Sequence, residues 1–121
     1  MPSFEAARRA GANGLLVTVE SIFRVHRERV VGLARSFGLP SVFSEQLFVE
    51  ADGLMSYDAD RRALMIRSAD YVDKLLKGAR PQDLPIEQPT VFSIAINLRT
   101  ARALDIPIPP AILARATDVI E

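Results

Sequence analysis

The order of apolar and polar residues predicts short strands that alternate with helices. Residues 15–19, LLVTV, form an apolar and β-branched run that is typical of a buried parallel strand. Residues 41–44, SVFS, are interpreted as a second short strand. Residues 90–98, TVFSIAINL, alternate β-branched and apolar positions and form the best predicted strand of the chain. A short helix is expected over residues 3–10, because good helix formers precede Gly11 there.

Two longer helices are expected between these strands. The first covers residues 21–37 and is followed by Gly38 and Pro40, both of which favour a helix end. Apolar positions recur in it at spacings of three and four, the helical period, and the stripe consists of Phe23, His26, Val30, Leu33, Ala34 and Phe37. The second covers residues 59–77 and is ended by Gly78. Its buried side is expected to consist of Leu64, Ala69, Val72, Leu75 and Leu76.

The remaining segments are less regular. Residues 45–58 are interpreted as a loop, although LMSY within them has the composition of one more short strand. The loop after the second long helix is held extended by three prolines, because each proline fixes its own φ: Pro81, Pro85 and Pro89. A short helix near residues 100–104 and a last helix from about residue 110 complete the chain.

Strands that alternate with helices predict an α/β fold, here a Rossmann-like three-layer unit with a mostly parallel sheet. The strand–helix–strand order of residues 15–44 predicts a parallel pair with a right-handed crossover. Only three or four strands are expected, which are few for such a sheet. Some strand edge or helix face is therefore expected to be left uncovered.

Composition narrows the function classes. Of the 121 residues, 49% are hydrophobic and 25% charged, and the 15 basic residues balance the 15 acidic ones. A net charge near zero argues against a nucleic-acid partner, because such binding needs a basic excess. There is no cysteine, so disulfides, thiol nucleophiles and cysteine-ligated metals are excluded. The N-terminus has no apolar signal segment, so the chain as written is expected to stay in the cytoplasm.

Few residues are candidates for ligand binding or catalysis. Glu20 and Ser21 follow the first strand, at the carboxyl end where ligands bind in open α/β sheets, so Glu20 is a candidate acceptor for a ligand ammonium. The alternative is that Ser21 only caps the next helix and Glu20 only favours its dipole. His26, the single histidine, is interpreted as a packed core or interface residue. No catalytic group, metal site or cofactor is predicted.

Three segments carry a family resemblance: EADGLMSYD, YVDKLLKGARPQDLPIEQPTVFSIAINLRTARAL and IPPAILARATDVIE. They resemble the C-terminal part of bacterial ABC transporter substrate-binding proteins, the group that includes tryptophan- and tyrosine-binding lipoproteins. The upstream RRAGANGLLVTVESIFRVHRERVVGLARSFGLPSVF is similar to the elements that precede them in that family. The resemblance extends from about residue 4 to residue 121.

The resemblance implies part of a type I periplasmic binding protein, in which two Rossmann-like lobes close on a solute. The chain, residues 1–121, is then one α/β domain that corresponds to the C-terminal part of such a protein. Residues 1–48 would be a βαβ unit of the C-terminal lobe, residues 49–58 a hinge-like segment, and residues 59–121 a helix–strand region with a tail. The signal, the lipid-attachment cysteine, most of one lobe and part of the other would be missing.

The same resemblance implies a site and partners. Met55, Ser56 and Tyr57 match the family's hinge motif and are candidate ligand contacts, while Asp52 and Asp58 stand where the family pattern has glycines. The implied ligand is a small solute such as an aromatic amino acid, and an ABC permease is the implied partner in a full-length context. The implied location is the periplasm. The alternative is a remnant that acts as a self-associating structural domain, for which a homodimer is expected.

Overall fold

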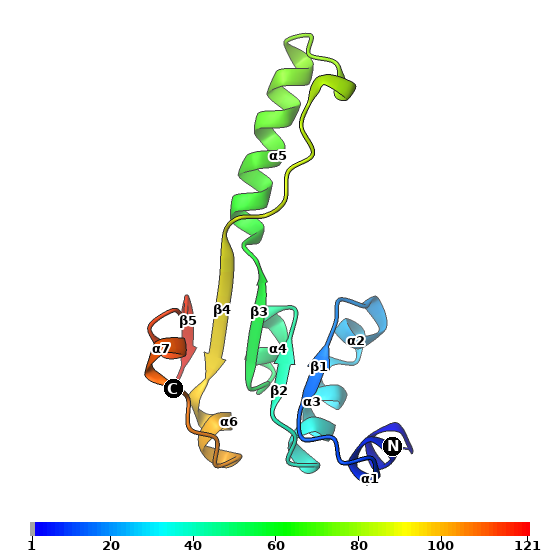
Figure 1. Cartoon of the computed structure of the whole chain (residues 1–121), viewed down its shortest axis with the longest axis vertical. Helices are drawn as coiled ribbons and strands as arrows, with labels where there is room; N and C mark the ends of the chain where they lie inside the picture. Colours follow the sequence, from blue (N-terminus) through cyan, green and yellow to red (C-terminus); the bar gives the residue numbers. More distant parts are fainter. Residues whose placement is uncertain (1) are drawn as a thin grey trace. The chain divides into compact units, whose positions relative to one another are not determined.

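The computed structural model describes residues 2–121, and its elements alternate between helix and strand (Figure 1). In chain order they are α1 (Pro2–Arg9), β1 (Leu15–Val17), α2 (Ser21–Val25), α3 (Arg27–Ser36), β2 (Ser41–Phe43), α4 (Gln46–Glu50), β3 (Met55–Ala59), α5 (Arg61–Leu76), the 3-10 helix η1 (Pro81–Asp83), β4 (Phe92–Asn97), α6 (Leu98–Ala103), α7 (Pro110–Leu113) and β5 (Asp118–Ile120). The described chain forms two compact units. The sheet unit contains the residues up to Asp58 together with Ser93–Glu121, and the hairpin unit contains Ala59–Phe92.

The sheet has five strands in the order β1-β2-β3-β4-β5. β1 pairs in parallel with β2, β2 with β3, and β4 with β5. The N–H of Asn97 donates to the carbonyl of Leu54 at 2.9 Å, and Figure 1 draws β3 and β4 in opposite directions. The predicted α/β class with a mostly parallel sheet is confirmed.

One apolar core holds helices α3 and α4 against strands β1 and β2. Its centre is the stacked pair Phe43 and Phe48, whose ring centroids are 4.8 Å apart. Val17 and Val31 complete the buried cluster. Leu16, between two inward-facing residues of β1, is 71% exposed because successive strand residues point to opposite faces.

The buried side-chain amide of Asn97 connects β4 to α4. Asn97, which is 0% exposed, donates from Nδ2 to the carbonyl of Val49 at 3.3 Å. Its Oδ1 accepts the N–H of Thr100 at 3.1 Å and so caps α6. The Thr100 hydroxyl donates to the carbonyl of Asp52 at 3.0 Å. These bonds satisfy buried polar groups, which would otherwise destabilise the fold, and they connect α4 to β4.

The structure corrects the prediction of one helix over residues 21–37. His26 leaves helical geometry, with φ −103° and ψ 25°, and separates α2 from α3. Its side chain is exposed, so the interpretation of His26 as a packed core residue is wrong. Of the predicted stripe only Ala34 is buried. Val31, one turn earlier in α3, is also buried, whereas α2 buries no residue.

Two further segments differ from expectation. Residues 45–58 are not a loop, since they contain α4 and β3, and the alternative of a strand at LMSY is the correct one. The last helix stops at Leu113, and residues 118–120 form β5. The sheet therefore has five strands rather than three or four.

The hairpin unit consists of α5, η1 and the extended segment that follows. Asp60 caps α5 by accepting the N–H of Ala63 at 2.8 Å, and Gly78, with φ 98°, follows the helix as predicted. The predicted buried side of this helix is wrong, because no residue of α5 is buried.

Candidate functional site

The carboxyl ends of β1, β2 and β3 meet at one edge of the sheet unit, because the three strands are parallel neighbours. We call this the carboxyl edge. Glu20 and Ser21 follow β1, Ser44 and Glu45 follow β2, and Tyr57 lies near the end of β3. Open α/β sheets bind ligands outside such strand ends.

Glu20 and Ser21 are both exposed at this edge. Glu20 occupies the N-cap position of α2, with φ −140°, and its side chain makes no capping hydrogen bond. Ser21 is the first residue of α2 and not its cap. The alternative interpretation of Ser21 as a capping residue is therefore wrong. The predicted ligand contacts of Glu20 and Ser21 stay predictions.

Met55, Ser56 and Tyr57 lie within strand β3 and not in a loop. Ser56 is 2% exposed and is in register with the core residue Phe43. Tyr57 is 46% exposed and Met55 is half-buried. Because strand residues alternate between faces, Met55 and Tyr57 share the face opposite Ser56. The three side chains thus do not converge on one point.

Two residues at the carboxyl edge were not singled out from the sequence. Glu45 is a buried carboxylate, with a side chain only 6% exposed, and its Oε2 lies 3.7 Å from Nε of Arg24 in α2. The Oγ of neighbouring Ser44 is buried and has no hydrogen-bond partner among residues 2–121. Their position in the sequence could have identified them, because Ser44 and Glu45 follow a strand just as Glu20 and Ser21 do.

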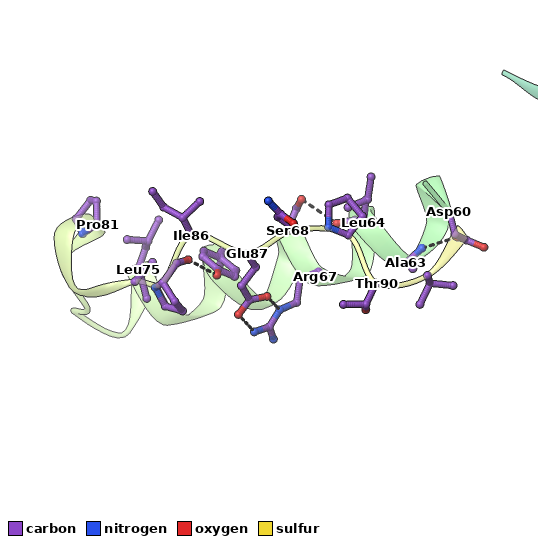
Figure 2. A pocket seen from close by; sticks show the side chains of 16 residues that line it. Asp60, Ala63, Leu64, Arg67, Ser68, Leu75, Pro81, Ile86, Glu87 and Thr90 are labelled. Atoms are coloured by element: carbon purple, nitrogen blue, oxygen red, sulfur yellow. Dashed lines mark hydrogen bonds and ion pairs between the residues drawn. The ribbon is translucent and has the colours of Figure 1, made fainter. Parts of the chain in front are cut away.

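A concave region lies in the hairpin unit, where a groove of about 1060 Å³ runs between α5 and the segment that returns beside it (Figure 2). It is mostly apolar, which is typical of binding grooves and of surfaces that await a packing partner. Its apolar walls include Leu64, Leu75, Leu84, Ile86 and Val91.

The polar residues of the groove bind one another. Figure 2 shows the guanidinium of Arg67 joined to both carboxylate oxygens of Glu87, and the Nε–Oε2 distance is 2.5 Å. The Tyr71 hydroxyl donates to the carbonyl of Pro85 at 2.6 Å, and Arg67 and Lys74 lie 5.4 and 5.6 Å from the Tyr71 ring centroid. These contacts hold the returning segment against α5.

The pKa shifts in the groove follow from these contacts. The hydrogen bonds from Arg67 lower the pKa of Glu87, because they stabilise its charged form. Partial burial and the nearby Glu87 raise the pKa of Tyr71. Both shifts favour the existing protonation states at neutral pH. These contacts therefore stabilise the returning segment on α5.

Comparisons with known proteins agree with this architecture. The family model described as ABC transporter substrate binding protein matches residues 12–120. A comparison with curated proteins finds no match. In the part of the chain that the structure describes, no helix is both long and apolar enough to cross a membrane.

Three solved structures are similar to the chain. A conserved domain protein from Vibrio cholerae has a TM-score of 0.82 and 24% identity over 98% of this chain and 40% of its own. An ABC domain from Streptococcus pneumoniae in complex with L-Trp has a TM-score of 0.76 and 29% identity over 89% of this chain and 38% of its own. A ligand-free, open substrate-binding protein with adhesive properties from Clostridium difficile has a TM-score of 0.70 and 17% identity, covering 98% and 39%.

The chain thus spans 38–40% of the length of these solved chains. The predicted likeness to part of a periplasmic-binding-protein fold is confirmed. The division into residues 1–48, 49–58 and 59–121 stays a prediction.

Proposed function

Because the chain belongs to the ABC transporter substrate-binding protein family, we propose that it forms part of a solute-binding protein for a small molecule such as an aromatic amino acid. The observation that carries this proposal is the family match over residues 12–120. The L-Trp bound to the similar structure from Streptococcus pneumoniae supports the aromatic ligand. Membership of a binding family favours recognition over catalysis.

We place the ligand at the carboxyl edge. Glu20 and Ser21 are exposed there, and the half-exposed ring of Tyr57 offers both apolar contact and a hydroxyl. Met55 shares the face of Tyr57, while Ser56 supports the strand from the opposite face. An edge that combines an aromatic face with carboxylate and hydroxyl groups suits the two ends of an aromatic amino acid.

The partner that this function implies is an ABC permease, to which a solute-binding protein delivers its ligand. The location proposed with it is the periplasm or the cell exterior, where proteins of this family typically act. Co-purification of the chain with a membrane-embedded permease, in the presence of the ligand, would support the partner.

The proposal is tested by thermal unfolding of the purified chain in the presence of single amino acids and other small solutes. A ligand at about 100 times its dissociation constant stabilises the folded state by about 2.7 kcal/mol, which visibly raises the melting temperature. We expect a shift with Phe, Tyr or Trp and none with sugars. The absence of a shift with every solute, at millimolar concentrations, would contradict the proposal.

Self-association into a homodimer is a second candidate function. The observation in its favour is α5, a helix of 16 residues in which no side chain is buried although several are large and apolar. Helices in globular proteins gain most of their stability from packing an apolar face, so such a helix favours a partner.

A further inference from the structure

In two places along the chain an Asn or Asp precedes a glycine, Asn13-Gly14 and Asp52-Gly53. We propose that Asn13 is a site of spontaneous conversion to isoaspartate, with water as the only co-reactant, and that the fold leaves this site open while it protects Asp52. The conversion adds one methylene group to the backbone between α1 and β1 and loosens their connection. The inference goes beyond the proposed function and needs no ligand.

The reaction uses only the atoms of the dipeptide and water. The Gly14 nitrogen attacks Cγ of Asn13, the bond from Cγ to Nδ2 breaks, and ammonia leaves with the proton of the Gly14 N–H. The resulting succinimide ring is opened by water. Addition of water to the main-chain carbonyl leaves Gly14 attached through Cγ, which is isoaspartate, whereas addition to Cγ gives ordinary aspartate. Glycine favours ring closure, because it has no side chain to obstruct the attacking nitrogen.

The structure leaves Asn13 and Gly14 free to react. Both residues are exposed and lie in the loop between α1 and β1, outside any helix or strand. Among residues 2–121, the Gly14 N–H has no hydrogen-bond acceptor and the Asn13 side chain has no hydrogen-bond partner. No bond of the fold therefore has to break before the Gly14 nitrogen reaches Cγ of Asn13.

In Asp52-Gly53 the corresponding nitrogen is held by the fold. The Gly53 N–H donates to the carbonyl of Phe48 at 2.7 Å, and Gly53 is buried. The Asp52 carboxylate also lies 3.3 Å from Arg35 and 3.8 Å from Arg99, which favours its ionised, unreactive form. Ring closure at Asp52 therefore requires the turn to open first, and local opening costs free energy.

The backbone is fixed on both sides of Asn13, so the conversion has a structural effect. At the end of α1, the N–H of Ala12 donates to the carbonyl of Ala7 at 3.0 Å. At the start of β1, the N–H of Leu15 donates to the carbonyl of Pro40 at 2.8 Å. Only two residues lie between these bonds, and they must absorb the extra methylene group. The Leu15 bond belongs to a strand at the edge of the sheet, and it is expected to weaken.

The test follows both dipeptides in the full chain during incubation in mildly alkaline buffer. The water is enriched in heavy oxygen, which enters the chain when the ring opens, and mass spectrometry of tryptic peptides locates it. The folded chain is compared with the chain unfolded in urea. We expect Asn13 to convert at nearly the same rate in both states, and Asp52 to convert at least about tenfold more slowly in the folded state.

Substitutions at the site separate the chemistry from its structural effect. Gly14→Ala places a methyl group beside the attacking nitrogen, and its Cβ would lie 3.6 Å from the carbonyl oxygen of Pro40, an ordinary contact. Asn13→Gln keeps the amide but requires a larger ring. Both variants are expected to lose conversion on the time scale on which the wild type converts, and Asn13→Gln carries the test if Gly14→Ala does not fold. Freshly prepared Asn13→Asp carries the charge of the product on a backbone of normal length.

Hydrogen exchange of the Leu15 amide, measured by nuclear magnetic resonance, reports the loosening. The amide is expected to exchange faster in the converted wild type than in the fresh protein, because its bond to the Pro40 carbonyl opens more often. In fresh Asn13→Asp it should exchange as in the unconverted wild type.

An Asn13 that stays intact in the folded chain, or an Asp52 that converts there as fast as Asn13, would overturn the inference. So would an unchanged exchange rate of Leu15 after conversion, or an equal acceleration in fresh Asn13→Asp, which would assign the effect to charge and not to backbone length. Conversion at Asn13 with faster Leu15 exchange, both absent in Gly14→Ala, supports the inference. None of these measurements involves a solute, so the proposed function stands or falls separately.

Discussion

At the scale of single residues, the turn between α4 and β3 contains an unfavourable backbone conformation. Asp52 has φ 69°, a left-handed conformation that glycine adopts far more easily than aspartate. The family resemblance implies a glycine at this position, where the sequence has an aspartate. The Asp52 carboxylate lies 3.3 Å from Arg35 and 3.8 Å from Arg99, and these ion pairs help to hold the turn.

The next residue, Gly53, yields a test of this turn. A Cβ at Gly53 would lie 2.5 Å from the carbonyl oxygen of Phe48 and 2.8 Å from the Phe43 ring, so Gly53→Ala forces the core to move. We expect it to lower the free energy of unfolding by about 1–3 kcal/mol. Gly32→Ala is the matched control, because a Cβ there meets nothing within 4 Å inside helix α3. It should stabilise the protein by about 0.5–1 kcal/mol.

Chemical denaturation of both variants measures these changes. Equal free energies of unfolding for Gly53→Ala and the wild type would show that the turn between Phe48 and Leu54 relaxes without loss, and would contradict the tight approach seen here.

Residue patterns alone located part of the candidate site. The position of Glu20 and Ser21 after a strand was readable, because strand ends can be inferred from β-branched runs. The pairing of Arg24 with Glu45 was not, since it joins residues 21 positions apart through the parallel pairing of β1 and β2. The opposite orientations of Ser56 and Tyr57 followed only once the segment was known to be a strand.

At the scale of elements, local signals predicted helix existence better than helix burial. Gly38 and Gly78, with φ 63° and 98°, follow α3 and α5 as expected, because left-handed C-termini depend on the local sequence. The break at His26 has no glycine or proline to mark it. The buried side predicted for α5 failed because periodicity shows only that a helix has an apolar face, and not that another element covers it.

Short strands depend on their neighbours even more. β5 has three residues, Asp118–Ile120, and pairs in parallel with Ala95–Asn97. Thr117 fixes this pairing, since its Oγ1 accepts the N–H of Ile94 at 3.0 Å and its own N–H donates to the Ile94 carbonyl at 2.8 Å. Such non-local bonds are invisible to a local sequence window, which favoured a helix there.

The ion pair between Arg67 and Glu87 in the hairpin unit should weaken at low pH. Arg67 lowers the pKa of Glu87 below its usual value of 4.5, so the stabilisation from Glu87 is fully present above about pH 4.5. It is lost as the pH falls through the lowered value, because protonation removes the charge that Arg67 binds. We expect wild-type stability to fall more steeply below pH 4.5 than that of Glu87→Gln.

Denaturant unfolding between pH 7 and pH 3 measures this difference, and the side-chain carbon shift of Glu87 in nuclear magnetic resonance reports its titration directly. Glu50→Gln is the control, since it removes an exposed carboxylate that forms no ion pair among the described residues. Parallel stability curves for the wild type and Glu87→Gln would show that the free energy of unfolding does not depend on the charge of Glu87.

At the scale of the whole molecule, the main feature is apolar surface on α5. Met65, Ala69, Val72 and Leu76 follow one another at spacings of four, three and four, and we call them the α5 stripe. Leu76 is 83% exposed and Met65 72%. This spacing is typical of helix–helix interfaces, so the stripe can pack against another helix.

This arrangement predicts a homodimer that one charged substitution in the stripe disrupts. Light scattering at micromolar concentration is expected to give twice the monomer mass for the wild type, and the monomer mass for Met65→Glu, because a buried unpaired carboxylate is strongly unfavourable. Ile86→Glu is the matched control, since it places the same charge at a fully exposed apolar residue outside the stripe and should remain dimeric. A monomeric wild type, or equal masses for Met65→Glu and Ile86→Glu, would contradict pairing through the α5 stripe.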